Sequence, residues 1–261
     1  MLGAARVCLV PVLLLLVVVG AHGQAPAQEL LVAAAADLRY AFEEMGIAFR
    51  QRTGVAPTFS LGSSGQLAHQ VEHGAPFDIF FSANAEFVER LARGGFVLPE
   101  TVQLYAIGRI VVWVRRDSPL DPTRGLGVLD DPRVRFVAIA NPEHAPYGEA
   151  ARQALERSGL LPRVRGRLVF GDNVSLTLQL VTSGNADVGI VALSLALAPT
   201  VAREGRYWLV PEALHEPLRQ ATGVVTRSQR QPLARAFLAF VNGDGRPIMR
   251  RFGFVLPGEA Q

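Results

Sequence analysis

The chain has 261 residues, of which 49% are hydrophobic and 19% are charged, and its formal net charge is +3. Every basic side chain is an arginine, and no segment concentrates arginines with aromatic residues, so we expect no nucleic-acid partner. This length and hydrophobic content predict a globular protein with one large domain or two modest ones.

The first predicted element is an export signal. Arg6 precedes the apolar run VCLVPVLLLLVVVG, and small residues follow it. A basic start, a short apolar centre and a small-residue exit are the three parts of a secretory signal. We predict a signal peptide at residues 1–27, cleaved after Gly23 or Ala27. An uncleaved membrane anchor is the alternative, but the run is short for a bilayer and Pro11 interrupts it.

The only cysteine, Cys8, lies inside this predicted signal. Val7 stands before it, where a lipid-attachment site would have a small residue. The exported chain would therefore contain no cysteine, which excludes disulfides, thiol catalysis and cysteine-ligated metals.

After the signal, strand-like runs alternate with helix-like runs, which predicts an α/β fold with mainly parallel sheets. Apolar runs predict strands at residues 30–36, 56–62, 78–84, 109–116, 134–140, 167–171 and 222–227, with a strand and turn at 186–197. Helical spacing and glycine stops predict helices at residues 38–54, 63–74, 86–95, 148–159, 174–184, 232–243 and 246–254. The segment 117–132 is rich in proline, glycine and aspartate and is expected to be a loop. These strands are too many for one simple sheet, so we expect two α/β lobes that share a hinge.

Four predicted strand-to-helix joints have small, hydroxyl or amide residues, at 33–38, 61–67, 140–148 and 171–175. The first turn of a helix has backbone N–H groups without internal partners, and it binds anions without lysine or arginine. In open α/β sheets, ligands also bind at the carboxyl ends of the strands. The joints therefore predict a nest of neutral donors for a compact oxyanion. The alternative is that Asp37, Ser64 and Asn173 only cap their helices.

The chain resembles a known family through a set of phrases that occur in the family's order. These phrases are AAAADL, FSLGSSGQLAHQVEHGAPFDIFFSAN, YAIGRIVVWV, NPEHAPYGEAA, GDNVSLTLQLV and GNADVGIVALSLAL. They are similar to periplasmic molybdate-binding proteins, the substrate receptors of molybdate ABC importers, over nearly the whole exported chain. The resemblance implies a type II periplasmic-binding-protein fold, with lobe 1 at residues 28–107 and 214–261 and lobe 2 at residues 108–213. It also implies a periplasmic location.

The family implies a buried molybdate or tungstate held by hydroxyl and backbone N–H donors. Carried over by position, Ser64 is a hydroxyl donor and Val174 a backbone donor. Asp37 stands where a serine or asparagine donor is common, and Ala36 where some members have threonine. Together with Tyr147, these are the predicted oxyanion-binding residues. They would contact the oxygens of the ligand, with no direct bond to the metal.

Two departures from the family concern a tyrosine. Many members have a ligand-binding tyrosine where this chain has Ala192, and have alanine where this chain has Tyr147. We expect the Tyr147 phenol to reach the oxyanion from a different wall, with Pro142 and Pro146 fixing the turn and the helix from Gly148 lending its N-terminus. A surface tyrosine beside a turn is the alternative.

Asp37 is difficult to reconcile with a dianion, because a carboxylate would repel it in a cleft of low dielectric. We expect its side chain to cap its own helix by accepting from the N–H of Arg39 or Tyr40, while its backbone N–H faces the ligand. If it instead pointed inward and accepted a proton, the binding site would suit a protonated anion such as hydrogen phosphate.

The catalytic and metal-binding hypotheses rest on few residues. His69 and His73 are four apart on one predicted helix, so a surface metal pair is conceivable, but a solvated helix face is favoured. Glu143 and His144 are adjacent in a turn, where two side chains seldom converge on one substrate atom. An exported serine hydrolase would use Ser64 with a histidine and needs that base within hydrogen-bond reach of the hydroxyl.

We therefore predict a non-enzymatic binding protein that captures molybdate, and tungstate as well, and delivers it to the membrane permease of an ABC importer. We expect a monomer with no cofactor, and a small oxyanion as its ligand. The alternatives are a receptor for sulfate or phosphate, the hydrolase, and the ligand-sensing module of a regulator. The predicted signal and the lack of a DNA-binding segment argue against the last of these.

Overall fold

The structure is a computed structural model that describes Gly3 and residues 29–259. The predicted cleavage points at Gly23 and Ala27, together with Cys8 and Pro11, lie outside the described residues. In the part of the chain that is described, no helix combines the length and apolar character needed to cross a membrane.

The first of two five-stranded sheets has the strand order β2-β1-β3-β10-β4. β1 pairs in parallel with β2 and β3, whereas β10 runs antiparallel to β3 and β4. The strand bounds are β1 (Leu30–Ala35), β2 (Pro57–Gly62), β3 (Ile79–Ser82), β4 (Gln103–Gly108) and β10 (Leu218–Val224). We call this sheet and its helices lobe 1.

The helices of lobe 1 cover both faces of this sheet. They are α1 (Arg39–Thr53), α2 (Ser64–Glu72), α3 (Ala85–Arg93), α9 (Gln231–Asn242) and α10 (Arg246–Arg251). As predicted, Phe42, Met45 and Phe49 recur on the buried face of α1, and Gly54 ends it in the left-handed region with φ 77°. The Phe42 ring packs edge-on against Phe81 of β3, with centroids 4.9 Å apart, which anchors the helix to the sheet.

The second five-stranded sheet has the order β7-β6-β8-β5-β9. β6 pairs in parallel with β7 and β8, whereas β5 runs antiparallel to β8 and β9. The strands are β5 (Ile110–Arg115), β6 (Val137–Ala140), β7 (Leu168–Gly171), β8 (Val188–Ala192) and β9 (Gly205–Leu209). The helices are α4 (Pro146–Arg157), α5 (Leu161–Val164), α6 (Val174–Thr182), α7 (Leu193–Ala196) and α8 (Pro199–Glu204). This is lobe 2.

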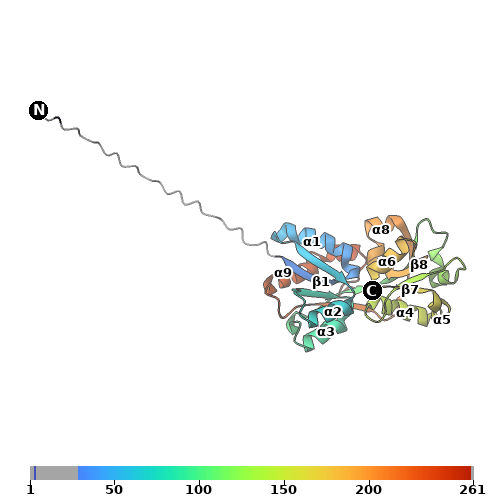
Figure 1. Cartoon of the computed structure of the whole chain (residues 1–261), viewed down its shortest axis with the longest axis horizontal. Coiled ribbons are helices and arrows are strands. Elements are labelled where there is room, and N and C mark those ends of the chain that lie inside the picture. Colours follow the sequence, from blue (N-terminus) through green and yellow to red (C-terminus); the bar gives the residue numbers. More distant parts are fainter. Residues whose placement is uncertain (1–2, 4–28, 260–261) are drawn as a thin grey trace.

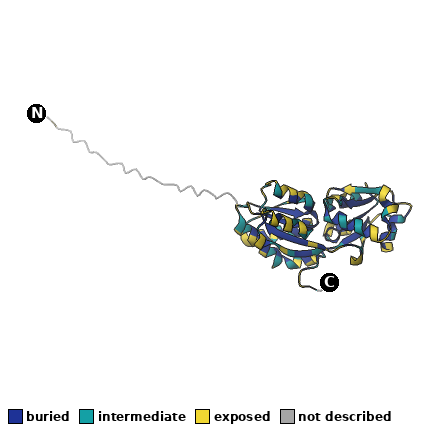
Figure 2. Ribbon diagram, turned by 90° about the horizontal axis from the view of Figure 1, so that it is seen from below, coloured by how far each residue is buried: buried dark blue, intermediate teal, exposed yellow. Residues whose placement is uncertain are grey.

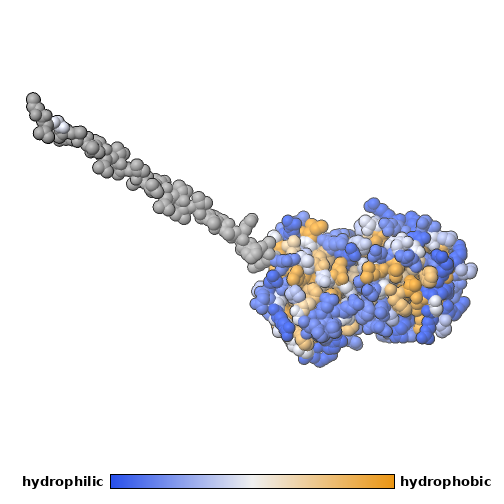
Figure 3. Space-filling view, viewed as in Figure 1, coloured by the Kyte–Doolittle hydropathy of each residue, from blue (hydrophilic) through white to orange (hydrophobic). Residues whose placement is uncertain are grey.

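The two lobes lie side by side, with α1, α2, α3 and α9 around β1 in one and α4, α5, α6 and α8 around β7 and β8 in the other (Figure 1). Buried residues follow the strands of both lobes, and exposed residues lie on the outer faces of the helices (Figure 2). Hydrophilic residues cover much of the visible surface (Figure 3). One hydrophobic cluster continues through both lobes, so the lobes pack against each other as well as internally.

The chain passes between the lobes between β4 and β5, where only Arg109 separates the strands, and again between β9 and β10. The predicted fold class of two α/β lobes is confirmed, and the described residues form two mixed sheets flanked by helices. The predicted lobe boundaries at residues 107/108 and 213/214 stay a prediction.

The expectation of mainly parallel sheets is wrong. Among the described strands, four pairs are parallel and four are antiparallel. The edge strands β4 and β9 were not predicted, and β10 begins at Leu218, four residues before the predicted start at residue 222. Periodicity reports burial and not strand direction, and an edge strand with one neighbour carries a weaker apolar pattern.

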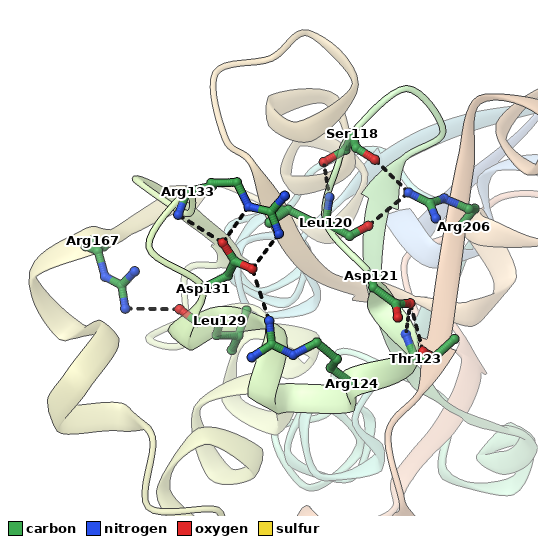
Figure 4. A network of polar contacts seen from close by, with 10 residues as sticks. All are labelled: Ser118, Leu120, Asp121, Thr123, Arg124, Leu129, Asp131, Arg133, Arg167 and Arg206. Carbon is green, nitrogen blue, oxygen red and sulfur yellow. Dashed lines mark hydrogen bonds and ion pairs between the residues drawn. The ribbon is translucent and has the colours of Figure 1, made fainter.

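The segment 117–132, predicted as a loop, contains two short 3₁₀ turns within Pro122–Asp130, which are separated by a kink at Gly125, and is held by charged contacts. The buried carboxylate of Asp131 accepts from Nε and Nη2 of Arg133 at 2.8 and 2.7 Å and from Nη1 of Arg124 at 3.0 Å (Figure 4). The hydrogen bonds from Arg133 hold the pKa of Asp131 well below its usual range. This network fixes the end of lobe 2 that lies beside β9.

Candidate functional site

A small cavity of about 10 Å³ lies where the carboxyl ends of the strands in the two lobes meet, which is room for about one water molecule. Every predicted oxyanion-binding residue lines it. The lining residues are Ala35, Ala36, Asp37, Gly62, Ser63, Ser64, Ala83, Ala145, Pro146, Tyr147, Asn173 and Val174. The four joints that are far apart in the sequence therefore converge on one place, as the arrangement of the sheets predicts.

The first joint places Asp37 in a 3₁₀ helix, Ala36–Leu38, between β1 and α1. Its Oδ2 accepts from the hydroxyl of Tyr147 at 2.9 Å and from Nε2 of Gln220 at 2.7 Å. The prediction that Asp37 caps its own helix is wrong, since the N-terminal position of α1 is Leu38 and no side-chain cap bond forms there. Asp37 lies in the 3₁₀ turn before α1, and its carboxylate contacts Tyr147 of α4 instead of an amide of α1.

The carboxyl of Asp37 is 1% exposed, and burial away from water raises its pKa to about 6. The hydrogen bonds from Gln220 and Tyr147, with a smaller contribution from the backbone amide of Asp37 itself, lower the pKa and only partly offset this rise. Its other oxygen, Oδ1, is buried and has no hydrogen-bond partner among the described residues. A buried polar atom without a partner is rare enough to call for an explanation.

Gln220 belongs to the polar network of Asp37 and was not among the predicted site residues. This fully buried side chain of β10 donates to Asp37 and, at 3.0 Å, to the hydroxyl of Tyr147. Its Oε1 accepts from the hydroxyl of Tyr105 at 2.7 Å, so the amide is held from both ends. The position of Gln220 within a strand could have indicated this role, because a glutamine buried in a sheet needs polar partners. The predicted strand began at residue 222 and left Gln220 out.

The close approach of this network to β4 explains Gly108. A Cβ atom at Gly108 would lie 2.2 Å from Oη of Tyr147 and 2.6 Å from Nε2 of Gln220. Only a glycine fits where the chain leaves lobe 1, because any other side chain would displace the Tyr147 hydroxyl and the Gln220 amide.

At the second joint the cap of α2 is Ser63, whose Oγ accepts weakly from the N–H of Gln66 at 3.4 Å. The alternative in which Ser64 is the cap is therefore wrong. Ser64 begins the helix, is 1% exposed, and accepts from the N–H of Ala83 at 2.9 Å through its Oγ. A hydroxyl that accepts this bond keeps its own hydrogen for a ligand in the cavity.

The third joint places Tyr147 in the first turn of α4, 3% exposed. The helix begins at Pro146, two residues before the predicted start at Gly148, because proline suits the first helical position. The alternative of a surface tyrosine is wrong. A Cβ at Gly148 would lie 2.1 Å from the carbonyl oxygen of Ala140, so the glycine lets α4 start directly against the end of β6.

At the fourth joint, Asn173 is a helix cap, as the simpler alternative proposed. Its Oδ1 accepts from the N–H groups of Ser175 and Leu176, both at 3.0 Å. Val174 begins α6 and is 3% exposed, so its amide lies at the N-terminal end of the helix beside the cavity. Four starts of helices thus surround the cavity with N–H and O–H groups and no lysine or arginine among the lining residues.

Hydrogen bonds across the two lobes enclose the cavity. Oγ of Ser63 lies 2.8 Å from Nδ1 of His144, and the N–H of Gly65 donates to the carbonyl oxygen of His144 at 3.0 Å. On the other side, the hydroxyl of Ser194 in α7 donates to the carbonyl oxygen of Asp37 at 2.7 Å. The lobes are therefore closed on the cavity in this structure.

The geometry does not supply what the hydrolase hypothesis requires. The Ser64 hydroxyl accepts a hydrogen bond from the Ala83 amide. Among the described residues, His144 contacts the neighbouring Ser63 and not Ser64. His69 and His73 stack with ring centroids 4.0 Å apart, and the described residues contain no group of three or more potential metal-ligating side chains.

Two lobes, each a mixed β-sheet flanked by helices, with a closed cavity between them define a two-lobed solute-binding protein of the type II class. The sequence profile of the bacterial extracellular solute-binding protein family matches residues 30–255. The chain therefore belongs to that family and, within it, to the periplasmic molybdate-binding proteins of ABC transporters.

Similar proteins cover nearly the whole chain. The molybdate-binding protein ModA of Rhodobacter capsulatus is 32% identical over 242 residues, which are 92% of this chain and 94% of the relative. The ModA protein of Escherichia coli is 29% identical over 90% of this chain and 92% of its own. The structure of the periplasmic molybdate-binding protein of Azotobacter vinelandii superposes with a TM-score of 0.82 at 33% identity, covering 87% of this chain and 99% of the other.

Proposed function

We propose that this protein captures molybdate, and tungstate as well, between its lobes and delivers it to the permease of an ABC importer. The observation that carries the proposal is the convergence of Ala36, Asp37, Ser64, Tyr147 and Val174 on one closed cavity. The molybdate-binding relatives support the identity of the anion. The profile of an extracellular family supports a periplasmic location, reached by the signal at residues 1–27.

The donors act on the oxygens of the anion and not on its metal. The Ser64 hydroxyl and the amide of Val174 donate from opposite lobes, and the amides of Ala36 and Asp37 add the first joint. Neutral donors at helix N-termini stabilise an anion that has lost its water, because the helix dipole and the free N–H groups face it. Each hydrogen bond to a charged group contributes about 1.5–3 kcal/mol.

Capture follows from movement of lobes 1 and 2 about the two crossing segments. Contacts of His144 with Ser63 and Gly65 join the lobes beside the cavity, so the ligand enters an open form in which these contacts are broken. Closure is favoured by the anion to the extent that it contacts donors of both lobes at once. Selectivity against sulfate, which carries the same charge, then comes from the size of the cavity that closes around the anion.

Isothermal titration of the protein with molybdate, tungstate, sulfate and phosphate tests the proposal. We expect tight binding of molybdate and tungstate and at least tenfold weaker binding of sulfate. Equal weak heats for all four anions would contradict a specific receptor. Preferential binding of sulfate or phosphate would favour the alternative of a receptor for that anion.

Asp37 is the residue that this proposal leaves to explain. Two unit charges about 4 Å apart repel each other by about 4 kcal/mol at an effective dielectric constant of about 20. An ionised Asp37 beside a dianion would therefore cancel the contribution of one or two of the donors.

A further inference from the structure

Asp37 lines the cavity, and one oxygen of its carboxyl group is buried without a hydrogen-bond partner among the described residues. Its Oδ2 already accepts two hydrogen bonds, from Tyr147 and Gln220, whereas Oδ1 is buried without a partner among the described residues. Asp37 lines the cavity, so a ligand that contacts this carboxyl does so through Oδ1. An ionised carboxylate can only accept, and a bare dianion has only acceptor oxygens. These two groups can form a hydrogen bond only if a proton lies between them.

Among the described residues, the groups that contact Asp37 or line the cavity with it carry no positive charge that could replace that proton. Tyr147 of α4, Gln220 of β10 and Tyr105 of β4 form its polar network, and Ser194 of α7 donates to its carbonyl oxygen. Asn173 and Val174 face the cavity from the start of α6 and are neutral.

Two arginines near Asp37 in the sequence or near its network in the fold form ion pairs with other carboxylates. Arg39 follows Asp37 by two residues but is exposed and pairs with Glu43. Arg109, at the crossing next to Gly108, pairs with Glu212. His144 on the opposite wall contacts Ser63.

We propose that Asp37 makes this a binding site for a protonated tetrahedral oxyanion, in which one proton is held between Oδ1 of Asp37 and an oxygen of the anion. The inference rests on the proposed function and deepens it. Molybdate and tungstate arrive as dianions, so the proton is taken from solution on binding. Hydrogen phosphate carries the same proton itself and needs none.

The energetics favour protonation over repulsion. Because burial raises the pKa of Asp37 to about 6, protonating it costs about tenfold in affinity for each pH unit above that value, which is about thirtyfold near pH 7.5. If Asp37 stayed ionised beside the dianion, the repulsion would lower the affinity about a thousandfold. Protonation is therefore the smaller loss across the neutral range.

The test is a proton count by isothermal titration in two buffers that differ in enthalpy of ionisation. Near pH 8, where Asp37 is ionised in the free protein, we expect uptake of about one proton per molybdate bound. The affinity for molybdate should fall about tenfold per pH unit between about pH 7 and pH 9. Hydrogen phosphate, if it binds, should bind at about pH 8 with no net proton uptake.

Asp37→Asn is the matched variant. The amide keeps an acceptor for Tyr147 and Gln220 and places an N–H donor where Oδ1 lies. We expect it to bind molybdate with no proton uptake and with an affinity independent of pH, tighter than the original protein near pH 8. Molybdate binding to the unmodified protein with no proton uptake and no pH dependence would overturn the inference and leave the proposed function standing. An absence of heat with every oxyanion at every pH would instead overturn the proposed function, and the inference with it.

Discussion

Ser63 and His144, 81 residues apart in the sequence, hydrogen-bond across the lobes at 2.8 Å between Oγ and Nδ1. Beside them, the N–H of Gly65 donates to the carbonyl oxygen of the same histidine. α2 of lobe 1 and the turn before α4 in lobe 2 are therefore held together at the mouth of the cavity.

The Gly65→Ala substitution should prevent this closure. A Cβ at Gly65 would lie 2.8 Å from the carbonyl oxygen of His144, which is backbone and cannot rotate away. Small-angle scattering should show that molybdate reduces the radius of gyration of the original protein but not of the variant. Gly166→Ala is the control, since its Cβ would meet nothing within 4 Å. Equal compaction of both variants would show that this contact does not govern closure.

Ser64→Ala should weaken molybdate binding about tenfold to a hundredfold. The substitution removes the hydroxyl hydrogen offered to the ligand, and a hydrogen bond to a charged group contributes about 1.5–3 kcal/mol. Titration calorimetry measures the loss. Ser183→Ala, at the exposed end of α6, should leave the affinity unchanged. If the two variants bind equally well, Ser64 is not a ligand donor.

Gly108→Ala should abolish binding while leaving the lobes folded. The added methyl group would displace the Tyr147 hydroxyl and the Gln220 amide, which meet at 3.0 Å. Far-ultraviolet circular dichroism checks the fold, and calorimetry checks the binding. Retention of full affinity would mean that the Tyr147–Gln220 network plays no part in the binding site.

Tyr147→Phe should shift the pH dependence of molybdate binding. The phenol donates to the carboxylate of Asp37, and this bond helps to keep the pKa of Asp37 from rising further. Without the phenol, the pH at which molybdate affinity begins to fall should move upward. Tyr207→Phe, on an exposed tyrosine of β9, is the matched control. An unchanged pH profile would show that the Tyr147 hydroxyl has no effect on the pKa of Asp37.

Asp37→Asn should stabilise the free protein at neutral pH. A carboxyl whose pKa is raised in the folded state contributes stability that is complete below its unfolded pKa of 3.8 and is lost as the pH rises through about 6. The difference of about two pKa units corresponds to up to about 3 kcal/mol. Thermal unfolding should therefore show equal Tm values for the two proteins below about pH 4 and a variant several degrees more stable above about pH 7.

A second substitution controls for the loss of charge alone. Asp117→Asn, on a side chain 78% exposed, should change the free energy of unfolding by less than about 0.5 kcal/mol at either pH. A Tm difference between Asp37→Asn and the original protein that does not change with pH would contradict the raised pKa.

Much of the fold could be predicted because burial leaves a periodic pattern. The α1 helix shows this, with Phe42, Met45 and Phe49 on one face and Gly54 at its end. The antiparallel direction of β5 and β10 could not be predicted, because pairing across a lobe crossing depends on contacts between distant segments. The edge strands β4 and β9 were not predicted. Each pairs with only one neighbouring strand, so its apolar pattern is weaker than that of a central strand.

The residues around the cavity were predicted from helix starts and from the family resemblance, but their hydrogen bonds were not. The sequence places Asp37 next to a helix, and capping is the common use of an aspartate there. The contact with Tyr147 spans 110 residues and the contact with Gln220 spans 183, and no local pattern reports either. Ser63 and Ser64 differ by one position, and only the start of α2 decides which of them caps the helix and which faces the cavity.

The contacts between the lobes beside the cavity bear on the kinetics of exchange. An anion that binds donors of both lobes would be retained while the contacts of His144 with Ser63 and Gly65 persist. The residence time of the cargo is then the waiting time for the two halves to part. A docked importer that pulls them apart would shorten that wait without touching the anion itself.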